Sequence, residues 1–363
     1  AHSSHSPCDP PQPFATPAPC TPTDYPHSVT PKREIIHLGE TDWYDKPAWY
    51  DILHHAGTSE EADSVEAIAR RFLSRTSRLR ILEPACGTAR LLRTLSARGH
   101  SVVGFDMNPA MVEYARASFA RRELKGSIWQ DNMESFTPQR TDAKFDLVIN
   151  FINTIRHLHD EQSLTHHLAR VREVLQSKGI AAIGLSIMGE GIEHPSEDVW
   201  SGARGPCRVT QLVQYLPPES PDQPTTKASS KNMPKRAGSE TPRFETVLSH
   251  LTVTTPRREI HLDTTYRLRA WTGPEWLRIV RASGLEPVGV VDESALDLGG
   301  SASTPETDTQ NPAPPCHLPQ SWDTPRAHGY AIWILSRNQD CRCRPPELAA
   351  PRGRTPGSLA PEV

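Results

Sequence analysis

Between residues 79 and 187, short apolar runs alternate with stretches whose apolar residues recur at helical spacing. The apolar runs are 79–85, 101–105, 127–130, 145–150 and 180–187, and the helical stretches begin near 89, 109 and 161. Continuous apolar runs are typical of strands buried on both faces, and strands that alternate with helices form parallel sheets through right-handed crossovers. The alternation therefore predicts a doubly wound α/β fold.

The pattern changes after residue 187. Segments 208–215, 244–253 and 259–271 are rich in Val, Thr, Tyr and Leu with partial period-2 alternation, which indicates antiparallel strands. A helix over 274–283 and strands over 286–291 and 329–335 follow. We predict a mostly parallel, seven-stranded Rossmann-like sheet, with a small antiparallel cover inserted after its fifth strand.

Four segments lack the apolar residues that a packed core needs. The chain has 35 prolines in 363 residues, and many of them lie in the segments 1–32, 217–242, 297–325 and 339–363. Such segments cannot bury enough apolar surface to offset the entropy of ordering. We therefore expect disordered tails at 1–32 and 339–363, and one folded domain over 33–338 that carries two low-complexity insertions, 217–242 and 297–325.

Charge, cysteine content and hydropathy exclude several classes of partner. Lys and Arg total 40 against 43 Asp and Glu, so no basic field attracts nucleic acid. The seven cysteines are irregularly spaced, which favours a reducing compartment over a disulfide framework. No apolar run is long enough to cross a bilayer. The sequence predicts a soluble, cytoplasmic protein with no membrane or nucleic-acid partner, and leaves its oligomeric state open.

A metal site has little support in the sequence. Cys341, Cys343 and His317 are the one plausible ligand group, but they lack the paired CxxC knuckles of zinc sites. A solvated tail is the interpretation we favour for this segment, and we predict no metal.

The turn ILEPACGTARLL (81–92) follows the first strand of the predicted parallel sheet, where ligands bind in such folds. Asp106 ends the second strand, 19 positions after Gly87, and can accept hydrogen bonds from a ribose diol. A dinucleotide pyrophosphate requires three glycines, whereas this turn has Gly87 alone and Glu83 beside it. The turn favours S-adenosylmethionine over NAD, which makes a dehydrogenase the weaker alternative.

Together with WYDKPAWYDIL (43–53), VGFDMNPAMVEYA (103–115), DNMESF (131–136) and FDLVINFINTIRHL (145–158), this turn resembles the class I S-adenosylmethionine-dependent methyltransferases. The likeness is strongest to the small-molecule branch, and it covers 41–190 closely and 244–336 more weakly. It implies an S-adenosylmethionine cofactor and methyl transfer to a small organic acceptor by in-line displacement.

The resemblance also implies roles for residues around the turn. Glu83, Ala85 and Gly87 would line the methionine part of the cofactor, with Glu83 near its ammonium group. Asp106 would bind the ribose hydroxyls. Met107 would lie against the adenine ring, although methionines also fill gaps in cores. The family usually has glycine in place of Ala85 and Ala89, and Ala89 is the departure expected to weaken cofactor binding.

Further roles concern the adenine amino group and the reaction itself. Either Asp131 or Asn132 would contact the adenine amino group. Asn150 would face the sulfonium and the acceptor, unless it and Asn153 merely cap their turn. His157 is the candidate general base, and Tyr44 the candidate lid over the cofactor.

Each of these roles has a structural alternative. His157 and His159 would then pack within their loop, and Tyr44 and Tyr50 would form the apolar side of an N-terminal helix. For Arg269 and Trp271, which close the last cover strand, sealing the sheet is the interpretation we favour over substrate contact.

The acceptor is not defined by the sequence. FINT, after Asn150 at 151–154, differs from the (D/N)PPY arrangement associated with methylation of base nitrogens, so nitrogen, oxygen and carbon acceptors all remain open. Two other functions fit the same fold: an inactive methyltransferase-like binding or scaffold protein, and a methyltransferase that modifies proteins.

Overall fold

The computed structural model describes residues 33–73, 77–137, 144–189, 194–218, 242–292 and 329–337. All of them belong to one compact unit that begins at Arg33. The predicted tails 1–32 and 339–363 and the predicted insertion 297–325 lie outside the described residues, as does all but the ends of the insertion 217–242.

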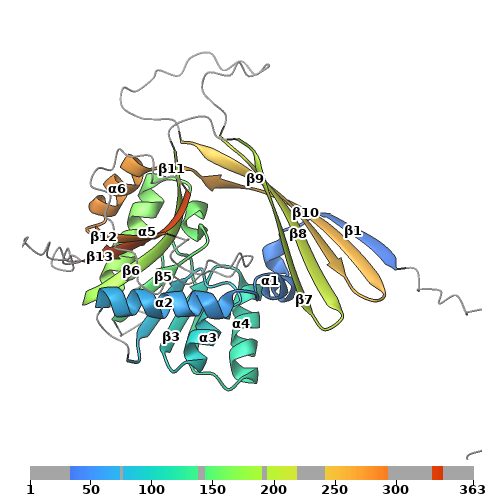
Figure 1. Cartoon of the computed structure of the whole chain (residues 1–363), viewed down its shortest axis with the longest axis horizontal. Coiled ribbons are helices and arrows are strands. Elements are labelled where there is room, and N and C mark those ends of the chain that lie inside the picture. The colour runs from blue at the N-terminus through green and yellow to red at the C-terminus, as the bar shows by residue number, and fades with distance from the viewer. Residues whose placement is uncertain are drawn as a thin grey trace, which may run out of the picture. The chain divides into compact units, whose positions relative to one another are not determined.

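The main sheet has the predicted seven strands, in the order β12-β13-β6-β5-β2-β3-β4, with the short β11 paired to β6 (Figure 1). Its strands are β2 (Arg80–Pro84), β3 (Ser101–Asp106), β4 (Gly126–Gln130), β5 (Phe145–Asn150), β6 (Leu175–Met188), β11 (Trp271–Thr272), β12 (Glu286–Asp292) and β13 (Gly329–Ser336). Only β13 runs against its neighbours. The order reverses between β2 and β5, and such a switch point is where open α/β sheets bind their ligands.

Helices cover both faces of this sheet. The helices are α2 (Thr58–Leu73), α3 (Arg90–Ala97), α4 (Pro109–Arg121), α5 (Glu161–Val174) and α6 (Gly273–Ala282). Helices α2, α3 and α4 pack against alternate strand residues such as Ile81 and Leu147, while α5 and α6 pack against Leu82 and Val148. Because successive strand residues point to opposite faces, each buried strand supplies both layers of the core. Within the described ranges, every helix is too short or too polar to span a membrane.

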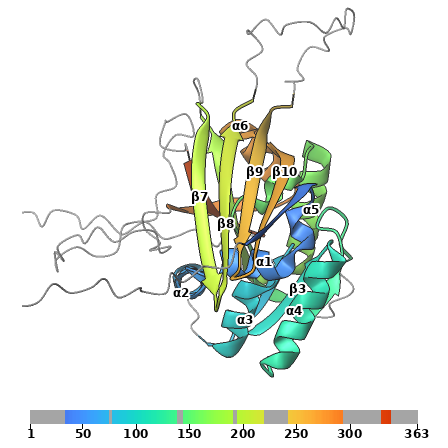
Figure 2. The ribbon, with the colours of Figure 1, turned by 90° about the vertical axis from the view of Figure 1, so that its right-hand side faces the viewer.

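The antiparallel cover is larger than predicted. It has five strands in the order β1-β10-β9-β8-β7, which lie side by side in Figure 2. Strands β7 to β10 pair antiparallel, whereas β1 pairs parallel with β10. They are β1 (Glu34–Glu40), β7 (Ser196–Arg204), β8 (Cys207–Leu216), β9 (Phe244–Thr254) and β10 (Arg258–Arg269). The sequence pattern missed the edge strands β1 and β7 because nearly all of their residues are exposed, which removes the period-2 signal. The cover is inserted after the fifth strand of the main sheet, as predicted, but it also takes β1 from the start of the domain.

The segment 43–53, which contains the candidate lid residue Tyr44, folds as the short 3₁₀ helix η1 (Trp43–Asp45) and the helix α1 (Pro47–Leu53). Trp43, Ile52 and Leu53 pack with the inner side of the cover, including Val209 and Leu251. Asp42 caps η1 by accepting a hydrogen bond from the Tyr44 amide at 2.9 Å. The segment is thus held by the cover on one side, in agreement with the view that its aromatic residues form the apolar side of a helix.

The closeness of this packing generates a prediction about Gly202 in β7. A Cβ atom at Gly202 would lie 2.2 Å from the Ile52 carbonyl oxygen. Gly202→Ala should therefore lower the free energy of unfolding by about 1–3 kcal/mol, because a backbone carbonyl cannot move aside cheaply. Urea denaturation measures the change. In the control, Gly273→Ala, the nearest contact is Ile187 Cγ2 at 4.0 Å, and the change should stay within about 0.5 kcal/mol. Equal losses in the two variants would contradict the close approach.

Candidate functional site

The carboxylate of Asp106, at the carboxyl end of β3, joins two turns. Its Oδ2 accepts a hydrogen bond from the Gly87 amide at 2.8 Å, and its Oδ1 accepts one from the Asn108 amide at 2.8 Å. The side chain is 9% exposed, and burial raises its pKa despite the hydrogen bonds from Asn108 and Gly87. Each carboxylate oxygen has a second lone pair, so Asp106 can still accept from a ligand. The contact between Asp106 and a ribose stays a prediction, and the two hydrogen bonds fix where the carboxylate lies.

The turn between β2 and α3 has an unusual backbone. Ala85, Gly87 and Ala89 all have positive φ angles, of 51°, 53° and 55°. The left-handed region costs a residue with a Cβ roughly 1–2 kcal/mol, and glycine avoids this cost. This explains physically why glycine suits the positions of Ala85 and Ala89. We predicted Ala89 on the first helical turn, but it lies one step earlier, as the left-handed cap of α3.

Glu83, at the end of β2, has a buried carboxylate oxygen without a partner. Among the described residues, nothing hydrogen bonds to its Oε2. The nearby Arg90 is occupied, since it binds both Glu61 oxygens at 2.7 and 2.8 Å and Thr58 Oγ1 at 3.0 Å. Burial raises the pKa of Glu83 to about 8, although Arg90 works against the shift. An unpaired buried carboxyl group of this kind suits a cationic ligand.

Asn150 ends β5, across the switch point from Glu83. Its side chain is 1% exposed, and its Nδ2 donates to the Pro84 carbonyl at 3.0 Å, which ties the ends of β5 and β2 together. Its Oδ1 is buried and has no partner within the described ranges. Asn153 differs, because both of its amide atoms bind Ser186, at 2.6 and 2.9 Å. The Asn153 side chain therefore ties its turn to β6 and makes no cap hydrogen bond to η3 (Thr154–His157), whereas Asn150 keeps one acceptor without a partner.

Met107 follows Asp106 directly and leaves 67% of its side chain exposed. It therefore fills no gap in the core. The end of β4 lies alongside, since Gln130 Nε2 donates to the Met107 carbonyl at 3.1 Å. An exposed, polarizable thioether beside the Asp106 carboxylate is suited to contact a flat ring.

The two candidates for the adenine amino group lie in the turn after β4 and have different surroundings. Asp131 Oδ2 accepts from Trp129 Nε1 at 3.1 Å, and its Oδ1 accepts from the Asn132 amide at 2.9 Å. Asn132 is exposed, and its Oδ1 accepts from the Glu134 amide at 2.9 Å. Both side chains thus accept hydrogen bonds from backbone amides of the turn, and Asn132 is the more exposed of the two.

An aromatic cluster, made of Tyr44, Tyr50, His157 and Tyr266, joins η1, α1, η3 (Thr154–His157) and β10. Its ring centroids lie 6.0 Å apart for Tyr44 and Tyr50, 6.1 Å for Tyr44 and His157, and 5.7 Å for His157 and Tyr266. Tyr50 lies against the turn between β2 and α3, because its Cε1 is 3.6 Å from where a Cβ of Gly87 would be. Burial raises the pKa values of the three phenols, that of Tyr50 to about 12, so all three are neutral at pH 7.

The structure distinguishes the two candidate histidines. His157 has an accessible face but sits among the aromatic rings, and desolvation together with His159 and Arg156 lowers its pKa to about 4. The imidazole is therefore neutral at pH 7 and able to accept a proton, but its lowered pKa makes it a weak base. The His159 ring contacts the Arg267 carbonyl at 3.2 Å and meets Phe244 edge to face. His159 therefore has the loop-packing role.

Arg269 and Trp271 seal the sheet, as the favoured interpretation has it. Arg269 is 3% exposed and binds Glu275 Oε1 at 3.0 Å and the Arg243 carbonyl at 3.0 Å. Its guanidinium lies 4.2 Å from the centroid of Trp271, which is fully buried. Neither side chain is available to a substrate.

Asn108 is a site residue that the sequence analysis did not single out. Its Oδ1 caps α4 by accepting from the Ala110 amide at 2.8 Å, and its Nδ2 donates to Asp45 Oδ1 at 2.8 Å. It therefore links η1 to the turn that Asp106 holds. The signal was present in the sequence, since Asn followed by Pro is a typical helix start.

A metal centre finds no ligand group here. Within the described ranges no three His, Cys, Asp or Glu side chains are arranged to hold an ion. The group Cys341, Cys343 and His317 lies outside the described residues.

The comparisons with known sequences agree on one family. Residues 81–179 match the methyltransferase domain family. A putative methyltransferase of Geobacillus sp. (strain WCH70) is 26% identical over 132 residues, 36% of this chain and 52% of that protein. A ubiquinone biosynthesis O-methyltransferase of Rickettsia akari (strain Hartford) is 24% identical over 141 residues, 38% of this chain and 55% of that protein. The chain spans about half the length of these curated relatives.

Solved structures show the same fold over more of the chain. An S-adenosylmethionine-dependent methyltransferase from Clostridium acetobutylicum ATCC 824 gives a TM-score of 0.51 at 12% identity, covering 81% of this chain and 98% of that one. A sugar N-methyltransferase from Streptoalloteichus sp. ATCC 53650 gives 0.51 at 17% identity, covering 90% and 99%. At such identities the likeness concerns the fold.

The fold and the turn first define a class: a Rossmann-like domain that binds its ligand at the switch point between β2 and β5. The match over residues 81–179 then assigns this part of the chain to the methyltransferase domain family, and the fold is the one that S-adenosylmethionine-dependent methyltransferases share. The predicted fold and family are confirmed. S-adenosylmethionine is the cofactor of this class, and the small-molecule branch fits the structure.

The left-handed backbone of the turn predicts that alanine-to-glycine changes at two positions shift the free energy of unfolding in opposite directions. Ala85→Gly should raise the free energy of unfolding by about 0.5–1 kcal/mol, because glycine adopts a positive φ without strain. Ala117→Gly, at an exposed position in α4, should lower it by about 1 kcal/mol, because there the backbone is helical. Chemical denaturation of both variants measures the difference. Losses of similar size in both would contradict the left-handed conformation at Ala85.

Proposed function

We propose that this protein transfers the methyl group of S-adenosylmethionine to a small organic acceptor. The observation that carries the proposal is the pair of acids on either side of one left-handed turn. Glu83 offers an unpaired buried oxygen, and Asp106 offers a fixed carboxylate. S-adenosylmethionine has an ammonium group and a ribose diol, so its two ends match these two acids.

The same turn disfavours a dinucleotide. The Gly87 amide, which a phosphate would need, already donates to Asp106. The Asp106 carboxylate beside the turn would also repel a pyrophosphate. S-adenosylmethionine carries no phosphate, so neither feature opposes its binding.

The remaining polar and apolar groups fit the rest of the cofactor. Met107 would lie on the adenine ring, Asn132 or Asp131 would meet its amino group, and Asn150 Oδ1 would face the sulfonium. Ala85 and Gly87 would line the methionine part, and Tyr44 on η1 and Tyr50 on α1 would cover it. These assignments are proposals that rest on the positions described above.

Methyl transfer requires the protein mainly to position the acceptor and to exclude water from the site. The cofactor supplies a methyl group on a sulfonium, whose positive charge disperses as the new bond forms. The side chains must hold the acceptor in line near the methyl group and exclude water, a task for the aromatic cluster. His157, neutral at pH 7, would accept the proton that a hydroxyl or a neutral amine releases as its bond to the methyl group forms. An amine or an alcohol is therefore the acceptor class that we propose.

Asp106 provides the direct test of the cofactor site. Asp106→Asn keeps the shape of the side chain but turns one acceptor oxygen into a donor. We expect the affinity for S-adenosylmethionine, measured by calorimetry, to fall roughly 100-fold, because two hydrogen bonds to a charged group are weakened. We prefer this variant to Asp106→Ala, which would leave the Gly87 and Asn108 amides unpaired.

The control for this experiment is Asp63→Asn, since Asp63 is an exposed acid whose partner is Arg98 on the surface. Its affinity should equal that of the unmodified protein. An affinity of Asp106→Asn equal to that of the unmodified protein would refute the proposed cofactor site. A folded protein that binds no S-adenosylmethionine at all would support the inactive scaffold instead.

Glu83 generates a pH-linked prediction. Its pKa of about 8 lies above the usual 4.5, so the carboxyl group is protonated in the free protein near neutral pH. The cofactor's ammonium group favours the ionised form, so binding at pH 6.5 should release about one proton. Calorimetry in two buffers of different ionisation enthalpy detects the release, and Glu83→Gln should abolish it. An enthalpy independent of the buffer would contradict the ammonium assignment.

The same shift affects stability without the cofactor. Because the folded protein holds this proton and the unfolded chain loses it near pH 4.5, the contribution of Glu83 to stability falls as the pH rises from about 4.5 to about 8. Glu83→Gln should flatten the fall over that interval, which thermal unfolding at several pH values would show.

A further inference from the structure

Asp51, the second acid of the WYDKPAWYD segment, takes no part in the site described above. It lies on α1 and is 1% exposed. Its Oδ1 accepts from Arg93 Nη2 at 2.5 Å, and its Oδ2 accepts from the Tyr114 hydroxyl at 3.0 Å and from Arg204 Nη2 at 2.8 Å. One carboxylate on α1 is thereby bound by α3, α4 and the cover strand β7.

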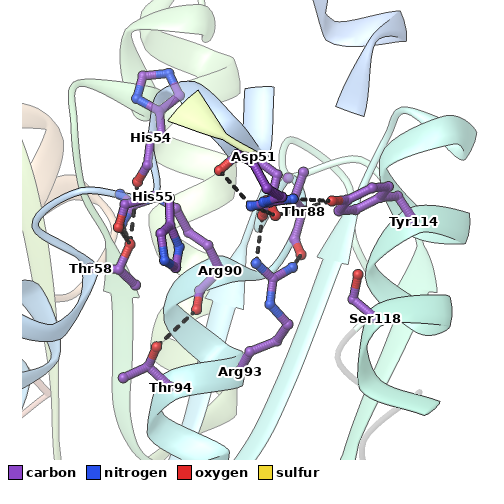
Figure 3. Close-up of polar contacts among 12 residues, drawn as sticks. Asp51, His54, His55, Thr58, Thr88, Arg90, Arg93, Thr94, Tyr114 and Ser118 are labelled. Atoms are coloured by element: carbon purple, nitrogen blue, oxygen red, sulfur yellow. Dashed lines mark hydrogen bonds and ion pairs between the residues drawn. The ribbon is translucent and has the colours of Figure 1, made fainter. Parts of the chain in front are cut away.

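The partner on α3 also holds the cofactor turn. Arg93 is 6% exposed, and its Nη1 donates to the Thr88 carbonyl at 2.7 Å. Figure 3 shows the guanidinium of Arg93 between Asp51 and Thr88. A guanidinium is planar and presents its donors in a rigid fork. Two nitrogens of the Arg93 guanidinium therefore hold the helix α1 and the turn together.

The residue before Asp51 is the one that covers the turn. Tyr50 Cε1 lies 3.6 Å from the position of a Cβ on Gly87, and the Tyr50 hydroxyl oxygen lies 4.0 Å from it. Because Tyr50 and Asp51 are adjacent on a single short helix, an anchor at Asp51 limits the movement of the Tyr50 ring. If the anchor loosens, the ring is free to move off the turn.

The network remains ionised over the ordinary pH range. Burial would raise the pKa of Asp51, but hydrogen bonds and charge from Arg93, with a hydrogen bond from Arg204, lower it to about 2. Arg204 also donates to the Tyr114 hydroxyl at 3.2 Å and is 44% exposed. Arg204 is thus the one charged partner of Asp51 that can be changed without burying an unpaired charge.

We propose that Asp51 is a positioning residue, which holds Tyr50 against Gly87 through Arg93, Tyr114 and Arg204 and so slows the escape of the bound cofactor. The inference rests on the proposed function, because it concerns S-adenosylmethionine in the site of Glu83 and Asp106. It assigns the cover strand β7 a role in cofactor retention, although β7 is remote in sequence from every motif of the site.

The test is a double-mutant cycle on cofactor dissociation. Arg204→Gln should raise the dissociation rate constant of S-adenosylmethionine about two- to five-fold, the range for a partly exposed ion pair. Tyr50→Ala should raise it too. If Asp51 acts through Tyr50, then Arg204→Gln should have no further effect in the Tyr50→Ala background. Stopped-flow displacement by excess S-adenosylhomocysteine measures all four proteins.

A matched control is Arg170→Gln. Arg170 is 43% exposed and pairs with Glu173 on the surface of α5, so its removal should leave dissociation unchanged. Hydrogen exchange supplies a second readout, since Arg204→Gln should speed exchange of the α1 amides while leaving those of α5 unaltered.

The outcomes separate two kinds of failure. Additive effects of Arg204→Gln and Tyr50→Ala, or an unchanged rate in Arg204→Gln, would overturn the positioning role while leaving the cofactor site in place. Absence of cofactor binding in the unmodified protein would overturn the proposed function and this inference with it. Non-additivity together with faster exchange in α1 would support the inference. Asp51→Asn is a less useful variant, because it leaves Arg93 buried with its charge unpaired.

Discussion

The carboxylate of Asp106 is the interaction on which the rest of the site depends. It stands at the end of β3 and binds one amide from the turn after β2 and one from the turn after β3 itself. Those two hydrogen bonds fix the start of α3 and the start of α4 relative to the sheet. They also consume the Gly87 amide, which a phosphate-binding turn would leave free. A single side chain thereby sets the geometry of the turn and narrows the choice of ligand.

The charges around the turn reinforce that choice. Arg90 and Arg93 both project from α3, and either could have made the turn attractive to an anion. Each is instead taken by an acid from the N-terminal part of the domain, Arg90 by Glu61 and Arg93 by Asp51. Glu83 is left beside them without a cation of its own. The result is a turn that favours positive charge, as expected for a sulfonium cofactor with an ammonium group.

The sequence predicted the parts of the structure that bury their residues in a regular pattern. The strands of the main sheet were recognisable as continuous apolar runs, and the helices between them by apolar residues at a spacing of 3.6. The edge strands β1 and β7 have no such signal, since they are exposed on both sides. Strand ends also located Glu83, Gly87, Asp106 and Asn150 at one edge of the sheet, because parallel strands bring their carboxyl ends together.

Other features depend on contacts that sequence spacing does not encode. The left-handed conformation of Ala85 and Ala89 is set by the surrounding fold, and alanine has no local preference that announces it. The partners of Asp51 come from α3, α4 and β7, up to 153 positions away along the chain. Asn108 could have been recognised from its helix-start signal, but its bond to Asp45 could not.

The central claim is that Glu83 and Asp106 hold the two ends of S-adenosylmethionine across one turn. A crystal structure of the complex with this cofactor tests it most directly. The account predicts the amino nitrogen within hydrogen-bond distance of Glu83 Oε2 and the ribose hydroxyls on the Asp106 carboxylate. A cofactor bound with neither contact, or bound away from the switch point between β2 and β5, would contradict it.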